Sequence, residues 1–264
     1  MATIWISATD LGIAATLVLL LALMTWRLHL GTGRQIVISA VRTTVQLLLI
    51  GLVLTTLFTH AEPGWVALMS LIMLLLAGRE VMARQDHRFA GWWGYGLGTL
   101  TMFVSSFSVA LLTLIGLIGP EPWYDPRYAI PLLGMILGNT MTGVSLALDS
   151  LTRLATQQRA AIEARLMLGH GWRDAIGDAE RQSMRSGLMP VINAMAAAGI
   201  VSLPGMMTGQ ILAGSPPMEA VKYQILIMFL IAIGTGFGTL SAIRLGARRL
   251  FDTRERLRLD RLKS

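Results

Sequence analysis

The chain has 264 residues, of which 54% are hydrophobic and only 14% are charged, and its formal net charge is +7. So little polar surface excludes an ordinary soluble domain and predicts an all-α integral membrane protein. The chain has no cysteine, which excludes disulfides and thiolate metal sites. The positive charge predicts membrane topology and contact with membrane lipids, and we expect no nucleic-acid partner.

Seven apolar stretches of about 20 residues are long enough to cross the hydrocarbon core as helices. The third ends near Arg79 and Glu80 and has the weakest pattern. Nothing basic precedes the apolar core of the first, so it is predicted to be a span and not a cleaved signal peptide. In chain order the expected spans are residues 8–26, 36–58, 64–83, 92–118, 128–148, 189–213 and 221–243.

Basic residues alternate between the segments that separate these spans. When Arg42 and Arg79 are counted with the nearer segment, only Arg127 and Lys222 of the 22 basic residues fall outside the segments after spans one, three, five and seven. Because basic segments stay in the cytoplasm, the N-terminus is predicted outside and the C-terminus inside. Residues 149–188 then form a cytoplasmic loop, and 244–264 form a basic tail, expected to be solvated and attracted to lipid.

Three of the polar side chains inside predicted spans need an explanation. Arg42 and Gln46 are four residues apart and share one helical face. Arg42 either snorkels to the cytoplasmic headgroups or faces a pore or another helix. Gln46 is predicted to hydrogen-bond a neighbouring helix. Asn139 is expected to be buried in span five, where it either bonds a neighbouring helix or lines a pathway.

The energy source for transport is predicted to lie on another chain. No Asp or Glu falls at mid-membrane, which disfavours a proton- or sodium-coupled carrier. No G-x-x-x-x-G-K-[ST] motif occurs, so this chain is not expected to hydrolyse ATP. The sequence contains no metal-binding motif and no paired acid and base. We therefore expect a transport subunit without catalytic residues or a cofactor of its own.

The long loop is predicted to be helical, with a turn at Gly169 and Gly171 between two pieces. Two interpretations of its one-sided apolar stripe remain: a helix lying on the headgroups, or a coupling helix that docks into a separate ATPase. The stripe consists of Ile162, Leu166, Trp172, Ile176 and Ala179.

Span six contains GIVSLPGMMTGQILAG, residues 199–214. Pro204 lacks a backbone N–H and clashes with the turn before it, so the helix is predicted to break and leave the carbonyl of Ile200 without its partner. We expect the break to line a transport path. Its methionines are predicted to be flexible packing, with soft metal ligation as the alternative. The expected gate is Pro204, Gly205, Met206, Met207 and Gly209.

Together, VSLPGMMTGQILAG, the AVKYQI that follows it, GMILGN in span five, and Arg42 with Gln46 resemble the FetB-like iron-export permeases of bacteria, whose plant relatives act in aluminium tolerance. The resemblance covers nearly the whole chain. It implies a multi-pass ABC exporter in the bacterial inner membrane, with two permease copies and two copies of a FetA-like ATPase that binds ATP and Mg. The EARLMLG segment resembles the E-A-A-x-x-x-G loop of ABC permeases, which implies ATPase coupling through Glu163, Ala164, Arg165 and Gly169.

The transported species stays open. Iron is the substrate that the resemblance implies, but Arg42 would repel a bare cation, and iron prefers oxygen, nitrogen or thiolate ligands. A chelated metal or an organic anion such as a nucleotide sugar fits equally well. A channel or carrier that needs no ATPase and uses the broken helix as its gate is the alternative mechanism.

Overall fold

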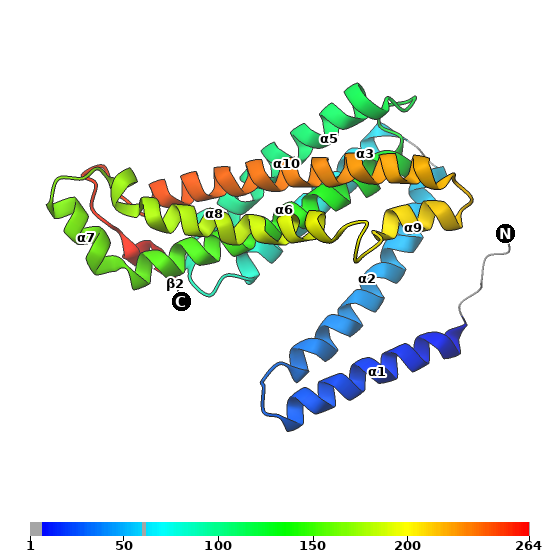
Figure 1. The fold of residues 1–264 in the computed structure, drawn as a ribbon, viewed down its shortest axis with the longest axis horizontal. Coiled ribbons are helices and arrows are strands. Elements are labelled where there is room, and N and C mark those ends of the chain that lie inside the picture. Colours follow the sequence, from blue (N-terminus) through cyan, green and yellow to red (C-terminus); the bar gives the residue numbers. More distant parts are fainter. Residues whose placement is uncertain (1–6, 60–61, 264) are drawn as a thin grey trace. The chain divides into compact units, whose positions relative to one another are not determined.

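The computed structural model describes residues 7–59 and 62–263 and is almost entirely helical (Figure 1). The chain divides into two compact units, the first ending after α2 and the second beginning before α3. Each unit has helices that are apolar enough for a membrane, so the predicted all-α membrane class is confirmed.

The first unit is a helical hairpin of α1, Ala8–Arg27, and α2, Gly33–Thr59. A capping box starts α1: the Ser7 hydroxyl accepts from the backbone N–H of Asp10, and the Asp10 carboxylate accepts from the backbone N–H of Ser7 at 2.9 Å. The two helices pack on each other and leave most of their apolar side chains exposed. Such surfaces suit a lipid environment.

The second unit is a bundle of helices with one short antiparallel sheet. Proline at the first helical position starts α3, α6 and α10, where a missing N–H is harmless. Its elements are α3 Pro63–Ala83, β1 Arg88–Phe89, α4 Trp92–Met102, η1 Phe103–Phe107, α5 Ser108–Leu112, η2 Thr113–Ile118, α6 Pro126–Gln157, α7 Arg159–Met167, α8 Trp172–Ala197, α9 Gly205–Leu212, α10 Pro217–Arg249, η3 Leu259–Arg261 and β2 Leu262–Lys263.

Three long helices, α6, α8 and α10, pack against one another at the centre of this unit. Helices α6 and α8 approach each other closely at Gly143 and Gly187, because a Cβ added at Gly187 would lie 2.7 Å from the Gly143 carbonyl oxygen. Helix α3 packs on α6 and α4, and α4 also contacts α10. The expected fourth span is a single apolar run in which the π-helical turns η1 and η2 alternate with α4 and α5.

Within the described residues, six helices are long and apolar enough to cross a membrane, where the sequence predicts seven spans. The difference is at residues 189–213, which do not form one helix: α8 ends at Ala197 and α9 begins at Gly205. Helices α8 and α9 both pack on α10 and together run beside it, with α9 next to the start of α10 (Figure 1). The six helices are Ala8–Arg27, Gly33–Thr59, Pro63–Ala83, Trp92–Ile118, Pro126–Gln157 and Pro217–Arg249.

The expected cytoplasmic loop is helical, and its predicted turn is confirmed. Helix α6 continues nine residues past Leu148, to Gln157, and Gly169 between α7 and α8 has a φ of +88°. The apolar stripe faces inward: Ile162, Ile176 and Ala179 are buried in the core, with Leu166 and Trp172 packed against it. The interpretation of this stripe as a face lying on headgroups is therefore wrong, since the protein itself covers it.

The expected solvated tail is instead folded. Helix α10 extends to Arg249, and the next two side chains, Leu250 and Phe251, are buried. Strand β2 pairs with β1 in the register Arg88 with Lys263 and Phe89 with Leu262. The apolar residues interspersed among the tail's arginines explain the difference, because they give the segment a core to pack into.

Candidate functional site

The predicted break in span six is present, but its cause differs from the prediction. Between α8 and α9, Gly199 adopts a φ of +81°, and its N–H donates to the Ser202 carbonyl at 2.9 Å. Pro204 is the N-cap of α9, with a φ of −62°. The helix has therefore ended several residues before the proline, so the Ile200 carbonyl is not a helical acceptor deprived of its donor. Glycine at positive φ ends α8, and proline starts α9.

The side chains around the break are poorly covered by the rest of the second unit. Ile200 and Val201 are 87% and 84% exposed. In α9, Met206 and Met207 are half-buried. A Cβ added at Gly205 or Gly209 would meet no described atom within 4 Å, so this pair does not mediate a close helix crossing inside the described unit.

Asn139 lies in the middle of α6, but it is exposed and not buried as predicted. Its Nδ2 donates to the carbonyl of Met135 at 2.8 Å, one turn earlier in the same helix. The amide therefore bonds no neighbouring helix among the described residues. Asn139 therefore places a polar group on an exposed face of a helix that is apolar enough to cross a membrane.

Arg42 and Gln46 belong to α2, in the first unit, and both are exposed there. Their four-residue spacing puts them on one face of the helix, as predicted. The other predicted pathway residues belong to the second unit.

Two of the four predicted coupling residues are engaged inside the α7–α8 hairpin. Glu163 pairs with Arg159 at 2.8 Å, and Arg165 binds Asp178 at 2.6 Å and the Ala175 carbonyl at 3.3 Å. The hydrogen bond from Arg165, with help from Arg181, holds the pKa of the Asp178 carboxyl below its usual value. Arg165 thus ties α7 to α8.

The exposed tip of this hairpin carries residues that the sequence analysis missed. Met167 and Leu168, directly before Gly169, are 82% and 79% exposed. Ala164 and Gly169 are also exposed. The sequence signal for this tip is the pair of large apolar residues in an otherwise charged loop. An exposed apolar patch of this kind is typical of a protein interface.

A second missed feature is a group of hydroxyls where α6, α8 and α10 cross. Thr140, Thr235 and Thr239 are at most 2% exposed, and their hydroxyls have no hydrogen-bond partner in the described part of the chain. They surround the glycines: a Cβ at Gly238 would lie 2.5 Å from Thr140 Cγ2, and one at Gly143 would lie 2.5 Å from Thr235 Cγ2. An added Cβ at these glycines would clash with the threonine methyl groups, so the helices are in direct contact there. The three hydroxyls therefore line no binding cavity.

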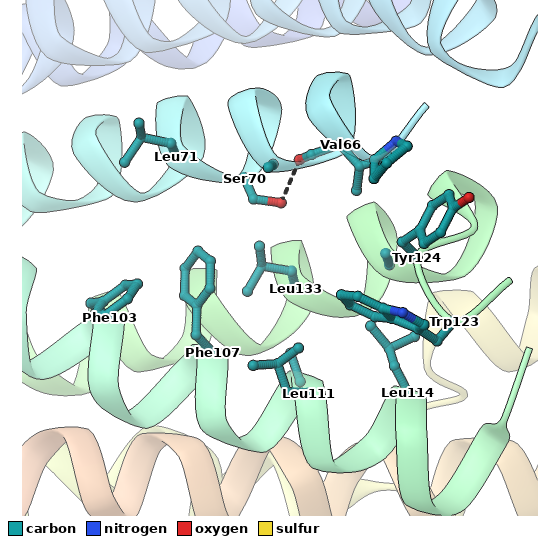
Figure 2. A pocket seen from close by; sticks show the side chains of 14 residues that line it. Val66, Ser70, Leu71, Phe103, Phe107, Leu111, Leu114, Trp123, Tyr124 and Leu133 are labelled. Atoms are coloured by element: carbon teal, nitrogen blue, oxygen red, sulfur yellow. Dashed lines mark hydrogen bonds between the residues drawn. The ribbon is translucent and has the colours of Figure 1, made fainter. Parts of the chain in front are cut away.

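An apolar pocket of about 340 Å³ opens between α3, the η1–α5–η2 run and the start of α6 (Figure 2). Phe103 and Phe107 form one wall, and Trp123 and Tyr124 lie at one end. The only side-chain hydrogen bond drawn there is that of Ser70, whose hydroxyl donates to the Val66 carbonyl at 2.8 Å. A pocket of this composition suits an apolar group and offers no ligand for a bare metal ion.

Comparison with known proteins places the chain beside one family. A family model described as "Uncharacterised protein family (UPF0014)" matches residues 8–251. No solved structure is significantly similar to the chain.

Several characterised or named relatives are similar over most of their length. A UPF0014 membrane protein of Synechocystis is 37% identical over 240 residues, 90% of each chain. The probable iron export permease protein FetB of Escherichia coli is 30% identical, covering 98% of this chain and 97% of the relative. The protein ALUMINUM SENSITIVE 3 of Arabidopsis thaliana is 32% identical, covering 87% of this chain and 81% of the relative.

Proposed function

Because this chain belongs to the UPF0014 family of membrane proteins, we propose that it is the permease subunit of an ABC exporter driven by a separate ATPase. It is a multi-pass protein of the membrane, and the family resemblance expected from its motifs is confirmed. The FetB relative is named a probable iron export permease, which supports metal efflux as the activity.

The break between α8 and α9 is the observation that carries the transport proposal. Backbone that is not helical survives at membrane depth only where protein or a polar cavity covers it. Ile200, Val201 and the segment around Gly199 are uncovered by the rest of the second unit. A second copy of the permease, or the path between two copies, provides the missing cover.

Asn139 supports the same arrangement. Its exposed amide, satisfied by only one hydrogen bond to its own helix, is costly against lipid and favourable against a partner helix or a hydrated path. We propose that this face of α6 lines the path between two copies, with Pro204, Met206 and Met207 at the gate. In the first unit, Arg42 and Gln46 of α2 remain proposed pathway contacts in their own right, because they are polar side chains in an apolar helix.

Helix α8 offers a direct route from an ATPase to the gate. It has 26 residues, hence a length of about 39 Å, and connects the exposed α7–α8 tip with the break. Arg165, bound to Asp178, holds α7 to α8, so the hairpin can move as a unit. We propose that Met167 and Leu168 insert into the ATPase, while the engaged pairs of Glu163 and Arg165 keep the tip rigid.

The substrate proposal is iron, by analogy with the named relative, and an organic or chelated anion is the second candidate. The guanidinium of Arg42 favours the second candidate, because a cationic group on a pathway attracts anions and repels bare cations. The membrane orientation with the N-terminus outside also remains a proposal, supported by the distribution of basic residues.

The test is co-expression with candidate ABC ATPases from the same genome, followed by purification and reconstitution. We expect an ATPase in stoichiometric amount and ATP turnover that rises when the correct substrate is added. Parallel liposomes with the chain alone provide the control. Transport by the chain alone, without nucleotide, would overturn the ABC proposal and favour the channel or carrier alternative.

A further inference from the structure

A pocket of about 720 Å³ lies between the N-terminal part of α8 and the C-terminal part of α10. Trp172, Arg173 and Glu180 line it from α8, and Arg244 and Arg248 line it from α10. The residues come from segments about 70 positions apart in sequence, brought together by the packing of α8 on α10. No pattern in the sequence singles them out.

The pocket carries more positive charge than its own partners neutralise. Three guanidinium groups surround one carboxylate. The guanidinium carbons of Arg173 and Arg248 each lie 5.4 Å from the centroid of the Trp172 ring, which orients them by cation–π contact. In the described part of the chain, no hydrogen bond or ion pair engages the guanidinium of Arg173, Arg244 or Arg248.

Glu180 does not complete the charge balance. Its Oε1 is buried without a hydrogen-bond partner among the described residues. Burial raises the pKa of its carboxyl, while Arg244 and Arg173 oppose that shift. Among the described residues no ion pair joins this carboxyl to Arg173, Arg244 or Arg248, so the donors of these arginines remain available to an added anion.

The position of the pocket along α10 identifies the kind of anion. Arg244 is the first charged residue after the apolar stretch of α10, so it lies where a membrane helix passes from hydrocarbon to headgroups. Guanidinium groups match phosphate oxygens in pairs of hydrogen bonds.

We propose that this pocket binds the phosphate of an anionic phospholipid headgroup, with Arg173, Arg244 and Arg248 as its ligands. The bound headgroup bridges α8 and α10 next to the folded tail, whose Glu255 carboxylate accepts from the backbone N–H of Trp172 at 3.1 Å. Lipid composition then sets how firmly α8 is held to α10. This inference does not depend on the transported substrate or on the ATPase.

The test uses the full chain purified in detergent and delipidated. Binding of phosphatidylglycerol and phosphatidylcholine is measured by native mass spectrometry, and the thermal midpoint Tm is followed as each lipid is added. We expect phosphatidylglycerol to bind and raise Tm, with phosphatidylcholine far weaker. Arg244→Gln should weaken phosphatidylglycerol binding about five-fold, and Arg244→Gln with Arg248→Gln about twenty-five-fold.

Two further variants separate this pocket from general basic charge. Arg153→Gln removes an exposed arginine of α6 outside the pocket and should change binding less than two-fold. Glu180→Gln keeps the shape, removes the competing carboxylate, and should tighten binding about three-fold. Equal losses for Arg153→Gln and Arg244→Gln would overturn the site.

Inorganic phosphate and pyrophosphate, added without lipid, distinguish the two sources of phosphate. A Tm shift by pyrophosphate that Arg244→Gln abolishes, with no preference for phosphatidylglycerol, assigns the pocket to a soluble phosphate and overturns the lipid. If neither phosphatidylglycerol nor the soluble phosphates bind, the phosphate site itself is wrong. The ligand-free Tm of each variant, compared with that of the parent chain, checks that folding is intact.

Discussion

Gly199 and Pro204 have different roles in interrupting the helix. Gly199, at a φ of +81°, occupies a conformation in which an L side chain is strained, and it ends α8. Pro204, at the N-cap of α9, takes the φ of −62° that its ring imposes and cannot supply an N–H to extend a helix from α8. The irregular segment is thus bounded by two residues that disfavour a continuous helix.

Substitutions at these two positions should separate stability from transport. Gly199→Ala should lower the free energy of unfolding by about 1 kcal/mol, because alanine is strained at positive φ. Pro204→Ala should leave assembly intact and lower coupled transport several-fold, because alanine does not fix the φ angle at the N-cap of α9 and the connection from α8 can change its conformation. Tm measurements and ATP-driven transport in liposomes test both. Full transport by both variants would contradict a role of the α8–α9 break in transport.

The two methionines of α9 allow the gate and ligand interpretations to be separated. In Met206→Leu with Met207→Leu, the shape is roughly kept and the thioethers are lost. Both side chains are half-buried, so we expect metal efflux to stay within two-fold of the parent chain. Efflux assays with the reconstituted complex measure this. A ten-fold loss without a change in Tm would instead indicate metal coordination.

At the scale of elements, the glycines that matter for packing are only partly those with G-x-x-x-G spacing. Gly234 and Gly238 of α10 do approach α6, since added Cβ atoms would lie 2.7 Å from Ile136 Cγ2 and 2.5 Å from Thr140 Cγ2. The Gly205 and Gly209 pair is open in the described unit. The tight contact of Gly143 with Gly187 joins two helices, so no spacing within one helix reveals it.

Gly187→Ala should therefore destabilise the α6–α8–α10 crossing. The new Cβ would meet the Gly143 carbonyl oxygen at 2.7 Å and Thr239 Cγ2 at 2.7 Å, so the helices must separate. We expect a loss of about 1–3 kcal/mol in the free energy of unfolding, followed by denaturant or thermal unfolding. Gly236→Ala on α10 is the matched control, since an added Cβ there meets no described atom within 4 Å. Similar losses in both would contradict the close crossing.

At the scale of the whole molecule, the α7–α8 hairpin and the C-terminal tail form one structured end. Trp172 at the start of α8 contacts Phe251 at a ring separation of 5.7 Å, and the sheet of β1 and β2 closes the tail on the α3–α4 connection. The exposed tip of Met167 and Leu168 projects from this end. A force applied at the tip therefore reaches α8 and α10 through a packed base.

Loss of the apolar tip should weaken ATPase binding without unfolding the permease. Met167→Ser with Leu168→Ser removes two side chains that are more than three-quarters exposed, so Tm should stay within about 2 °C. The amount of ATPase that co-purifies should fall at least ten-fold. His170→Ala, on the same turn, is the control and should retain the ATPase. Undiminished co-purification in the double variant would place the docking surface elsewhere.

The sequence by itself determined the membrane class, most of the spans, the helical loop with its turn at Gly169, the interruption of span six and the family. These properties follow from local patterns, since about 20 apolar residues, a glycine at a turn or a proline in a span act through neighbouring residues. Its local patterns also predict functional roles for Asn139 and the 163–169 segment.

Only the tertiary structure decided which faces these segments present. The stripe of Ile162 and Ile176 is buried by the protein and Asn139 is exposed, because the packing of α6, α8 and α10 selects one face of each helix and amphipathicity alone does not name the partner. The basic tail folds because Leu250 and Phe251 find a core that is distant in sequence. The pocket of Trp172 and Arg244 exists for the same reason: its charges converge only when α8 packs on α10.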